Sequence, residues 1–332
     1  MSETRDSDYQ SAGMPVLILG GSGFIGTRLA ETLIERGMDV RIGDIQRSER
    51  YPNLWTNCDV RDINSLRPLF RDVKAVINLA AEHRDDVRPI SRYYETNVQG
   101  AERVCEAARS AGINTILFTS SVAVYGFQKH AVEESGPFEP FNPYGDSKLK
   151  AEAVYRAWAD EDPARKLVIV RPTVVFGEGN RGNVYNLLKQ IASGKFVMVG
   201  PGRNYKSMAY VGNLAEFIAQ SLRFDAGTYI YNYVDSPDMN MTELVALVRR
   251  SLNKSSRRQF RIPLPIAMTA GHVLDQVARL TGRTFPISAI RIQKFCANTQ
   301  VSPKLALQSG FQPRFSLEEG LTKTIRAEFQ KK

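Results

Sequence analysis

Tyr144 and Lys148 lie four residues apart in the segment Tyr-Gly-Asp-Ser-Lys, and Ser121 precedes Tyr144 by 23 positions. Residues four apart on a helix share one face, with their β-carbons about 5–6 Å apart. The positive charge of a lysine favours phenolate over phenol, so the tyrosine becomes usable as a base nearer neutral pH. The spacing alone is common by chance on solvated helices. A glycine-rich loop upstream and a serine-rich strand end favour a catalytic pair.

That loop contains Gly20, Gly23 and Gly26, which follow a buried apolar run at residues 16–19 and open an apolar helical repeat. Glycines at these positions allow a tight turn and a close approach of the backbone to a ligand, and the helix N-terminus favours a pyrophosphate. A glycine triplet by itself is weak support, but the strand before it and the helix after it are what a dinucleotide site requires. The pattern therefore predicts a bound dinucleotide.

Asp44 ends the next strand, 18 residues beyond Gly26. A carboxylate there accepts hydrogen bonds from both ribose hydroxyls and repels a 2′-phosphate, which favours NAD over NADP. Arg47 is close enough in sequence to leave NADP open. Asp59 and Val60 are candidates for the adenine contact, although Asp59 could equally be an ordinary turn residue.

These residues need a scaffold of alternating strands and helices. The expected strands are short apolar runs, and the expected helices have an apolar repeat, with one at 24–36 ending at Gly37 and one at about 91–111. We expect an α/β fold, a Rossmann-type doubly wound parallel sheet with a smaller C-terminal substrate lobe interleaved with it. The expected parts are a flexible leader at 1–14, a cofactor domain at 15–175 and the substrate lobe at 176–330. The expected strands lie at 16–19, 40–42, 75–79, 115–118, 167–170 and 229–233. Further helices are expected at 183–192, 211–222 and 241–252, and a last one begins after Pro263 and Pro265 and ends near Gly282.

The amino-acid composition limits the class of protein to which this chain can belong. The 332 residues are 43% hydrophobic and 24% charged, as in ordinary soluble globular proteins, and there is no run of 18 apolar residues. Three scattered cysteines favour a reducing cytoplasm without disulfides. The three histidines show no ligand spacing, so we expect no metal site.

The charge is distributed unevenly. Residues 1–248 hold 28 Lys and Arg against 31 Asp and Glu, whereas residues 249–332 hold 16 basic groups against 4 acidic ones. This asymmetry suggests an anionic partner for the C-terminal part: a diphosphate substrate or an anionic membrane surface. We find no nucleic-acid-binding motif. A basic but merely solvated surface is the simpler alternative.

The chain resembles the extended short-chain dehydrogenase/reductases, in their nucleotide-sugar epimerase/dehydratase branch, from Gly20 to about Leu321. The markers are Gly20-x-x-Gly23-x-x-Gly26, Asp59-Val60-Arg61-Asp62, Asn78-Leu79-Ala80-Ala81, Asn97, Thr119-Ser-Ser-Val-Ala-Val-Tyr-Gly126, Tyr144-x-x-x-Lys148 and Arg171-Pro172. The resemblance implies NAD as the cofactor. The residues it places around NAD are Gly20, Gly23, Phe24, Ile25, Gly26, Asp44, Asp59, Val60, Leu79, Ala80, Ala81, Asn97, Tyr144, Lys148 and Pro172.

The resemblance also implies roles for three catalytic residues. Tyr144 would remove the proton of a sugar 4-hydroxyl, Ser121 would hydrogen-bond that oxygen, and Lys148 would lower the tyrosine pKa and bind the nicotinamide ribose. Hydride would pass from C4 to NAD, and its return to the other face of the 4-keto sugar would invert the alcohol. By spacing alone Ser120 fits as well as Ser121, and strand-end capping is the structural alternative for both.

Five segments are similar to the branch that acts on N-acetylglucosaminyl-diphospho-undecaprenol in O-antigen assembly. They are residues 80–87, 180–190, 204–213, 231–235 and 294–297. The resemblance implies a 4-epimerase interconverting GlcNAc and GalNAc on undecaprenyl diphosphate. The usual family pattern Arg-Asp-aromatic-x-His-Val-x-Asp is here Lys206-Ser-Met-Ala-Tyr-Val-Gly-Asn213, which suggests a different group on the diphosphate. Lys206 is the expected ligand of the diphosphate, and Asn183, Arg291 and Lys294 are further candidates.

Other functions remain open. A soluble UDP-N-acetylhexosamine 4-epimerase and a nucleotide-4-keto-sugar reductase fit the same motifs. A dehydratase fits less well, because its Thr-Asp-Glu pattern is here Ser120-Ser121-Val122. The intact Ser121, Tyr144 and Lys148 argue against a catalytically idle NAD-binding scaffold protein.

A basic cluster precedes an apolar repeat at helical spacing near the C-terminus. Such a pair can lie on an anionic membrane, so we expect a cytoplasmic protein able to associate with the cytoplasmic face of the bacterial inner membrane. The alternative is that the repeat packs in the core of the small lobe. A homodimer through the helices around Tyr144 is also expected from the family. The cluster is Lys254, Arg257, Arg258 and Arg261, and the repeat is Ile266, Ala270, Val273, Leu274, Val277 and Leu280.

Overall fold

A central sheet of seven parallel strands organises the chain. The structure is a computed structural model that describes residues 13–84, 86–128, 130–254, 260–281 and 288–330. The strand order β11-β6-β5-β4-β1-β2-β3 reverses direction between β1 and β4, which confirms the Rossmann-type doubly wound sheet. The strands are β1 (Pro15–Leu19), β2 (Asp39–Asp44), β3 (Trp55–Asn57), β4 (Ala75–Asn78), β5 (Thr115–Thr119), β6 (Lys166–Pro172) and β11 (Gly227–Tyr233).

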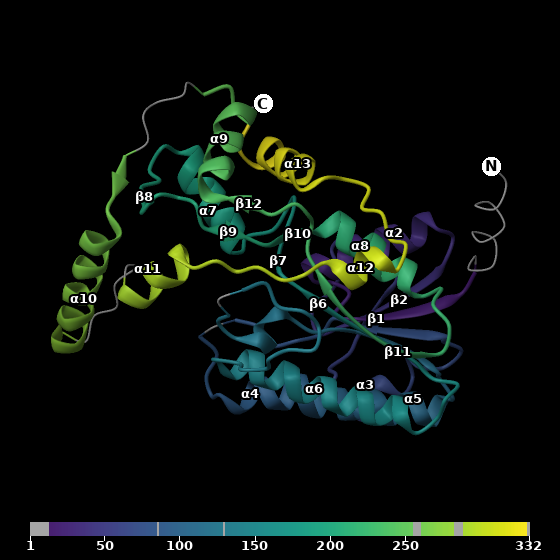
Figure 1. Cartoon of the computed structure of the whole chain (residues 1–332). Coiled ribbons are helices and arrows are strands. Elements are labelled where there is room, and N and C mark those ends of the chain that lie inside the picture. The colour runs from purple at the N-terminus through teal and green to yellow at the C-terminus, as the bar shows by residue number, and fades with distance from the viewer. Residues whose placement is uncertain (1–12, 85, 129, 255–259, 282–287, 331–332) are drawn as a thin grey trace.

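Helices cover both faces of the sheet (Figure 1). On one face lie α2 (Phe24–Glu35), α8 (Val211–Ser221) and α12 (Lys304–Gln308), and on the other lie α3 (Ile63–Leu66), α5 (Gly100–Ala111) and α6 (Pro143–Asp160). Successive strand residues point to opposite faces, so Val16 and Ile18 join one core cluster and Leu17 and Leu19 the other. The continuous apolar runs follow from this two-sided burial.

Some local features differ from the expected elements. The short edge strand β3 was not expected, and the helix expected at 91–111 is divided: α4 (Ser91–Tyr94) is followed by a π-helical segment (Glu95–Gln99) before α5. Arg36 caps α2 and Gly37 follows in the left-handed conformation (φ 75°), as the glycine signal indicated.

The second half of the chain builds its own core and also returns to the sheet. Phe176, Leu188, Val248 and Leu321 belong to one buried cluster formed by α7 (Asn183–Ala192), α9 (Met241–Ser251) and α13 (Leu317–Phe329) with short strands around them. In contrast, α8 covers the main sheet and β11 pairs with β6 at its edge. The short strands pair as β7 (Val174–Phe176) with β10 (Met208–Tyr210), β9 (Tyr205–Lys206) with β12 (Met239–Asn240), and β8 (Met198–Val199) with β13 (Arg261–Ile262).

Two helices, α10 (Leu264–Thr281) and α11 (Ala289–Cys296), pack on each other at the side of the molecule farthest from β1 and β2 (Figure 1). Of the basic cluster before them, Arg257 and Arg258 lie outside the described residues. Within the described part of the chain, no helix has the length and hydropathy of a membrane span.

Candidate active site

The glycine loop lies at the carboxyl end of β1 and packs tightly against its neighbours. Gly20 has φ 74°, and a β-carbon on it would come within 2.6 Å of the Ala80 nitrogen. A β-carbon on Gly26 would come within 2.5 Å of the Gly20 carbonyl oxygen. At Gly23 a β-carbon would meet only that oxygen, at 3.3 Å, and Gly23 caps α2 without a side chain over the helix N-terminus. This geometry suits a pyrophosphate on the first turn of α2, formed by Phe24, Ile25 and Gly26.

Asp44 stands beside this loop at the end of β2. Its Oδ2 accepts a hydrogen bond from the Ser22 nitrogen at 3.0 Å, and its Oδ1 accepts one from the Gln46 nitrogen at 2.9 Å. These two bonds fix the half-buried carboxylate, and each oxygen retains acceptor capacity for a ribose hydroxyl. Arg47 is exposed. The arrangement fits the ribose diol of NAD.

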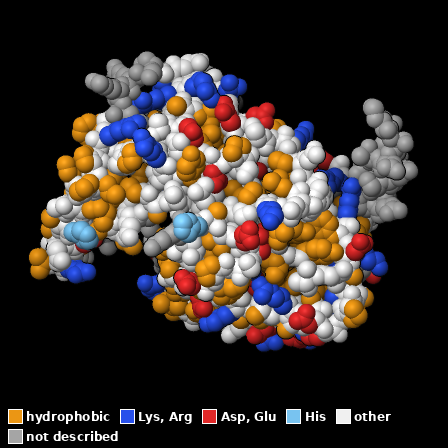
Figure 2. Space-filling view, viewed as in Figure 1, with side chains coloured by type: hydrophobic (Ala, Val, Ile, Leu, Met, Phe, Trp, Pro, Cys, Tyr) orange, Lys and Arg blue, Asp and Glu red, His pale blue; other side chains and the backbone are white. Residues whose placement is uncertain are grey.

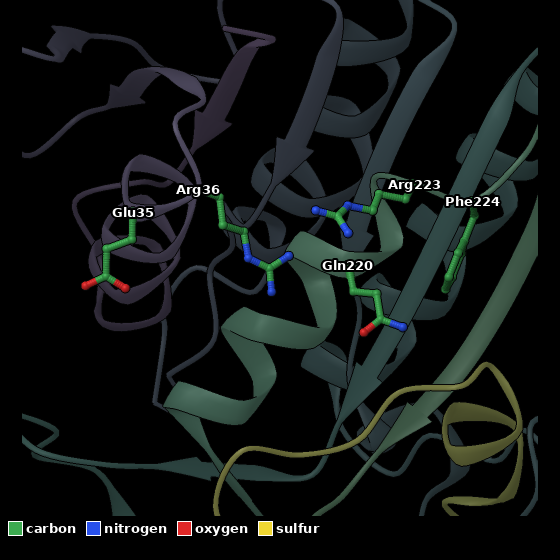
Figure 3. A pocket seen from close by; sticks show the side chains of 5 residues that line it. All are labelled: Glu35, Arg36, Gln220, Arg223 and Phe224. Atoms are coloured by element: carbon green, nitrogen blue, oxygen red, sulfur yellow. The ribbon is translucent and has the colours of Figure 1, made fainter. Parts of the chain in front are cut away.

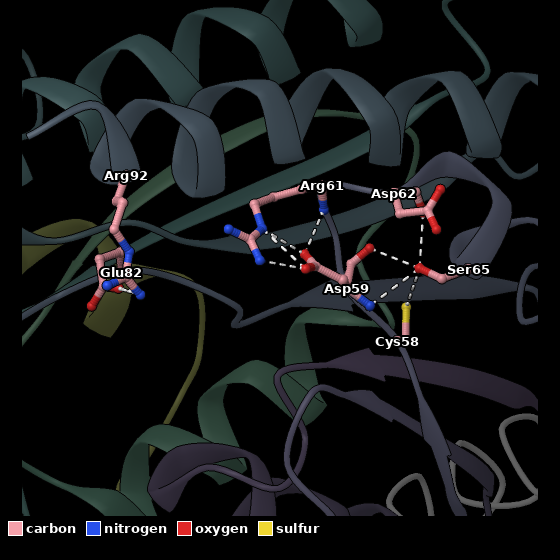
Figure 4. Close-up of polar contacts among 7 residues, drawn as sticks. All are labelled: Cys58, Asp59, Arg61, Asp62, Ser65, Glu82 and Arg92. Carbon is pink, nitrogen blue, oxygen red and sulfur yellow. Dashed lines mark hydrogen bonds and ion pairs between the residues drawn. The ribbon is translucent and has the colours of Figure 1, made fainter. Parts of the chain in front are cut away.

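Asp59 is engaged by its own turn (Figure 4). Its carboxylate accepts from the Arg61 backbone nitrogen at 3.0 Å and from the guanidinium Nη2 of Arg61 at 2.6 Å, which holds the pKa of Asp59 below its usual range. The hydroxyl of Ser65 donates to the Asp59 carbonyl and accepts from the Asp59 nitrogen. Val60 is buried, with its Cγ2 3.0 Å from the place of a β-carbon on Gly100. The geometry favours the turn role that the sequence left open for Asp59.

Asn97 organises the segment that follows β4. Its side chain exchanges two hydrogen bonds with the Glu82 backbone, at 2.9 and 3.0 Å, and donates to the hydroxyl of Ser147 at 2.8 Å. This buried amide ties Glu82, the residue after Leu79-Ala80-Ala81, to Ser147 on α6. Figure 4 shows Glu82 beside Arg92, an ion pair of 3.3 Å. Asn97 thus positions the loop proposed to contact the cofactor.

The structure separates the two serines at the end of β5. Ser120 is buried and donates to Glu152 Oε1 at 2.6 Å. Ser121 is half-buried, and its oxygen accepts the helix-capping bond from the Ala123 nitrogen at 3.1 Å. Adjacent residues of an extended strand point in opposite directions, so one serine faces the core and the other faces away from it. Ser120 is therefore committed to the core, and Ser121 stays the candidate for a substrate contact.

Tyr144 and Lys148 both lie in the first half of α6, which Asn142 caps by accepting from the Gly145 nitrogen at 2.8 Å. Tyr144 is half-buried. The Lys148 side chain is buried, with its ammonium 4.4 Å from the centre of the Phe118 ring. Burial lowers the pKa of Lys148 to about 7, against an opposing effect of the Glu152 charge. Helix periodicity places the tyrosine and lysine on one face, as the sequence predicted.

Behind Lys148 lies a buried ionic cluster that sequence reasoning missed. Glu152 and Arg171, both fully buried, form a bidentate pair with bonds of 2.8 and 2.6 Å. Arg171 also donates to the Tyr125 hydroxyl at 2.6 Å, and that hydroxyl donates to Asn232 Oδ1 on β11 at 2.6 Å. The available signal was the position of Glu152 four residues after Lys148, one turn farther along the same helix face.

The residues expected to bind the diphosphate come from β9, α7 and α11. Lys206 donates to the Ala297 carbonyl at 2.6 Å, and burial lowers its pKa to about 8. Asn183 is exposed at the first turn of α7. Arg291 and Lys294 lie on α11, just before Ala297, and their side chains fall outside the described part of the structure.

The candidate residues collect at one edge of the sheet. Five parts of the site stand at the carboxyl ends of parallel strands: the glycine loop, Asp44, residues 79–81, Ser121 and Pro172. They surround the reversal of strand order between β1 and β4, where sheets of this kind bind ligands.

A hollow of about 740 Å³ lies elsewhere, at the C-terminal ends of α2 and α8 (Figure 3). None of its lining residues is a predicted site residue; they are Glu35, Arg36, Gln220, Arg223 and Phe224. In the described part of the chain, no group of three or more His, Cys, Asp and Glu could hold a metal ion.

Comparisons with known proteins place the chain among its relatives. Residues 16–233 match the NAD dependent epimerase/dehydratase family. The chain is 50% identical over 316 residues, 95% of each protein, to N-acetyl-alpha-D-glucosaminyl-diphospho-ditrans,octacis-undecaprenol 4-epimerase of Escherichia coli O157:H7. It is 26% identical to a UDP-glucose 4-epimerase of Lactobacillus helveticus, over 82% of this chain and 83% of that one.

Solved structures share the fold. A UDP-N-acetylglucosamine 4-epimerase from Methanobrevibacter ruminantium superposes with a TM-score of 0.75 at 21% identity, and the NAD complex of Thermus thermophilus UDP-glucose 4-epimerase with 0.73 at 22%; each covers 95% of this chain and 98% of the other. The loop and carboxylate geometry fit NAD, which is the cofactor. The chain belongs to the NAD dependent epimerase/dehydratase family.

Proposed function

We propose that this protein is an NAD-dependent 4-epimerase that interconverts GlcNAc and GalNAc on undecaprenyl diphosphate through a 4-keto intermediate, in the synthesis of O-antigen or a related surface polysaccharide. The observation that carries the proposal is the 50% identity, across 95% of both chains, to a protein named for that activity. The arrangement of Ser121, Tyr144 and Lys148 supports it, because a binding module has no need for all three.

The proposed chemistry gives each of these residues one role, as the family resemblance implies. Tyr144 accepts the proton of the sugar 4-hydroxyl, and Ser121 hydrogen-bonds the same oxygen as it becomes a carbonyl. Lys148 favours the phenolate through its charge, and burial is the cause of its low pKa. NAD, when bound, supplies the chemistry of accepting hydride from C4 and returning it to the opposite face of the sugar. Ser120 serves the fold instead, because its hydroxyl is committed to Glu152.

For the diphosphate we propose Lys206, with Asn183, Arg291 and Lys294 as further ligands. Lys206 sits on β9, where the usual family pattern has an arginine. An anion beside this partly buried ammonium would raise its pKa from about 8 and keep it charged. A lysine acts on phosphate as a point charge, without the bidentate grip of arginine.

We also propose that Val60 contacts the adenine of NAD. A homodimer through the helices around Tyr144 is a further proposal, and sedimentation equilibrium tests it.

A lipid-linked substrate requires an enzyme that works at a bilayer. We therefore propose that this protein acts as a peripheral protein on the cytoplasmic face of the bacterial inner membrane. The positive charge of residues 249–332 supports this location, because that leaflet surface is negative.

The test is an epimerisation assay without added cofactor. Purified protein receives GlcNAc-diphospho-undecaprenol and UDP-GlcNAc in parallel, and the released sugars are analysed for GalNAc. We expect conversion of the lipid-linked sugar, and none by the Tyr144→Phe variant in the same preparation. Conversion of UDP-GlcNAc alone would keep the mechanism but replace the carrier. Inversion of neither sugar would refute the proposal and favour a 4-keto-sugar reductase.

A further inference from the structure

The helix α10 carries large apolar side chains on the outside of the molecule. Ile266, Val273 and Leu280 are 62%, 57% and 87% exposed. The sequence left open that this repeat packs in the core of the small lobe, and the structure shows instead that these residues are exposed. The buried positions of α10 are the small residues Ala267 and Gly271.

The geometry of a helix makes this arrangement informative. At 100° per residue, Ile266, Val273, Val277 and Leu280 fall within a sector of about 60°, and the packed side lies about 130° around the helix axis. On the packed side, a β-carbon on Gly271 would come within 2.8 Å of the Ala289 nitrogen on α11. A helix stabilised only by its own lobe would turn its large apolar residues inward. Here α10 has two apolar faces, a close-packed one of small residues and an exposed one that we name the outer stripe: Ile266, Val273, Val277 and Leu280.

The segment that carries the outer stripe is rich in cationic residues in its sequence. Residues 254–297 contain eight Lys and Arg and one acidic residue, Asp275. The Asp275 carboxylate accepts from the Ala289 nitrogen at 3.0 Å, so it faces α11 and not the outer stripe. Arg261 and Arg279 are exposed at the two ends of α10. The space-filling view shows hydrophobic side chains gathered on this projecting part of the molecule (Figure 2).

Charge decides which occupant fits. A second copy of the chain would bring two of these cation-rich segments together, and like charges across an interface are unfavourable. An anionic bilayer surface offers both an apolar layer for the stripe and negative headgroups for the cations. We propose that α10 lies in the interfacial plane of an anionic membrane with its outer stripe directed into the bilayer.

This docking is connected to the proposed diphosphate site. Directly after α11, the Ala297 carbonyl accepts from Lys206 on β9, and the Asn298 side chain accepts from the Tyr205 nitrogen at 2.9 Å. The Phe295 carbonyl, within α11, accepts from Asn204 at 2.8 Å. The helix α11, which packs on α10, and the residues directly after it are thus hydrogen-bonded to the strand that would hold the diphosphate, which would keep that strand close to the membrane surface. This part of the inference rests on the proposed lipid-linked substrate.

Vesicle flotation of the full-length protein tests the docking. We expect binding to phosphatidylcholine vesicles that contain phosphatidylglycerol, and weak binding to phosphatidylcholine alone. The Val273→Ser/Leu280→Ser variant should bind at least about tenfold more weakly, since it removes apolar area from the interface. The matched control is Leu307→Ser, a 48% exposed leucine on α12 whose replacement should leave binding unchanged. Equal vesicle binding by the double variant and the control would overturn the proposal. It would also be overturned if the wild type did not float with vesicles and the double variant lost a dimer that the wild type forms.

Turnover measurements separate this inference from the proposed function. The double variant should retain wild-type epimerisation of the lipid-linked sugar in detergent and lose it on vesicles. If the wild type floats with anionic vesicles but turns over no substrate, the docking stands and the proposed function fails. If the wild type turns over substrate in detergent but does not float, the docking is overturned while the function stands.

Discussion

Replacing Glu152 with glutamine should destabilise the protein strongly while changing its shape very little. The carboxylate is fully buried and accepts four hydrogen bonds, from Ser120, twice from Arg171 and once from Arg156. In Glu152→Gln one acceptor oxygen becomes an NH₂ group facing N–H donors, and the buried Arg171 loses its counter-charge. Breaking a buried pair in this way costs about 3–5 kcal/mol, a large part of the roughly 5–15 kcal/mol that stabilises a native protein.

Urea unfolding followed by circular dichroism measures this loss. The matched control is Glu161→Gln, since Glu161 also pairs with two arginines, Arg109 and Arg165, but its side chain is 42% exposed. We expect the control to shift the midpoint far less, because water screens exposed pairs. A loss below about 1 kcal/mol in Glu152→Gln would refute the view that this carboxylate neutralises a buried arginine.

The same substitution should alter catalysis through Lys148. The Glu152 charge raises the pKa of Lys148 against the lowering by burial. Without it that pKa falls further below about 7, so less of the ammonium remains at neutral pH to stabilise the Tyr144 phenolate. The alkaline limb of the kcat profile should therefore move to lower pH. An unchanged profile in folded Glu152→Gln would contradict this coupling.

The other expected outcomes concern single side chains at the proposed active site. Tyr144→Phe should bind NAD in calorimetry and lose at least about 10²-fold in turnover; retained turnover would remove Tyr144 as the base. Ser121→Ala should lose about 10²-fold in kcat, whereas Ser120→Ala should lose about 1.5–3 kcal/mol of stability with little change in kcat, and the reverse result would exchange their roles. Lys206→Ala should raise the KM for the lipid-linked sugar more than the Kd for NAD, and an unchanged KM excludes it from the substrate site. The pKa of Lys148 is about 7 in the folded protein, against an ordinary lysine value of 10.5. Between these two pH values the unfolded chain binds more protons than the folded protein, so the free energy of unfolding should rise with pH. Lys148→Met should abolish that rise in urea titrations.

The sequence predicted the sheet and the cofactor loop because their signals are local. The apolar run before Gly20 and the helical repeat after Gly26 each indicate one element, and the parallel arrangement then brings the strand ends together. The choice between Ser120 and Ser121 could not be made in this way. It depends on Glu152, 32 residues away from Ser120, whose carboxylate occupies the core side of β5.

Tertiary contacts also decide features that a periodic pattern leaves open. The repeat from Ile266 to Leu280 is the same whether its helix packs in a core or lies at an interface. The small residues Ala267 and Gly271 on the other side of the helix settle which face meets α11. Similarly, the pairing of Asp59 with Arg61 is a tertiary detail that favours the turn role, whereas the motif alone is equally compatible with a ligand contact.

The position of β11 limits how this protein can be divided. A gene fragment ending near residue 175 would contain every residue proposed to contact NAD but would lack β11, so β6 would become an open edge with unpaired backbone groups along seven residues. It would also lack Asn232, leaving the Tyr125 hydroxyl and the Glu134 carboxylate in the core without that partner. Open edges of this kind recruit other chains. The cofactor half should therefore aggregate when expressed alone, and split-protein or domain-exchange designs would have to carry β11 together with the first half.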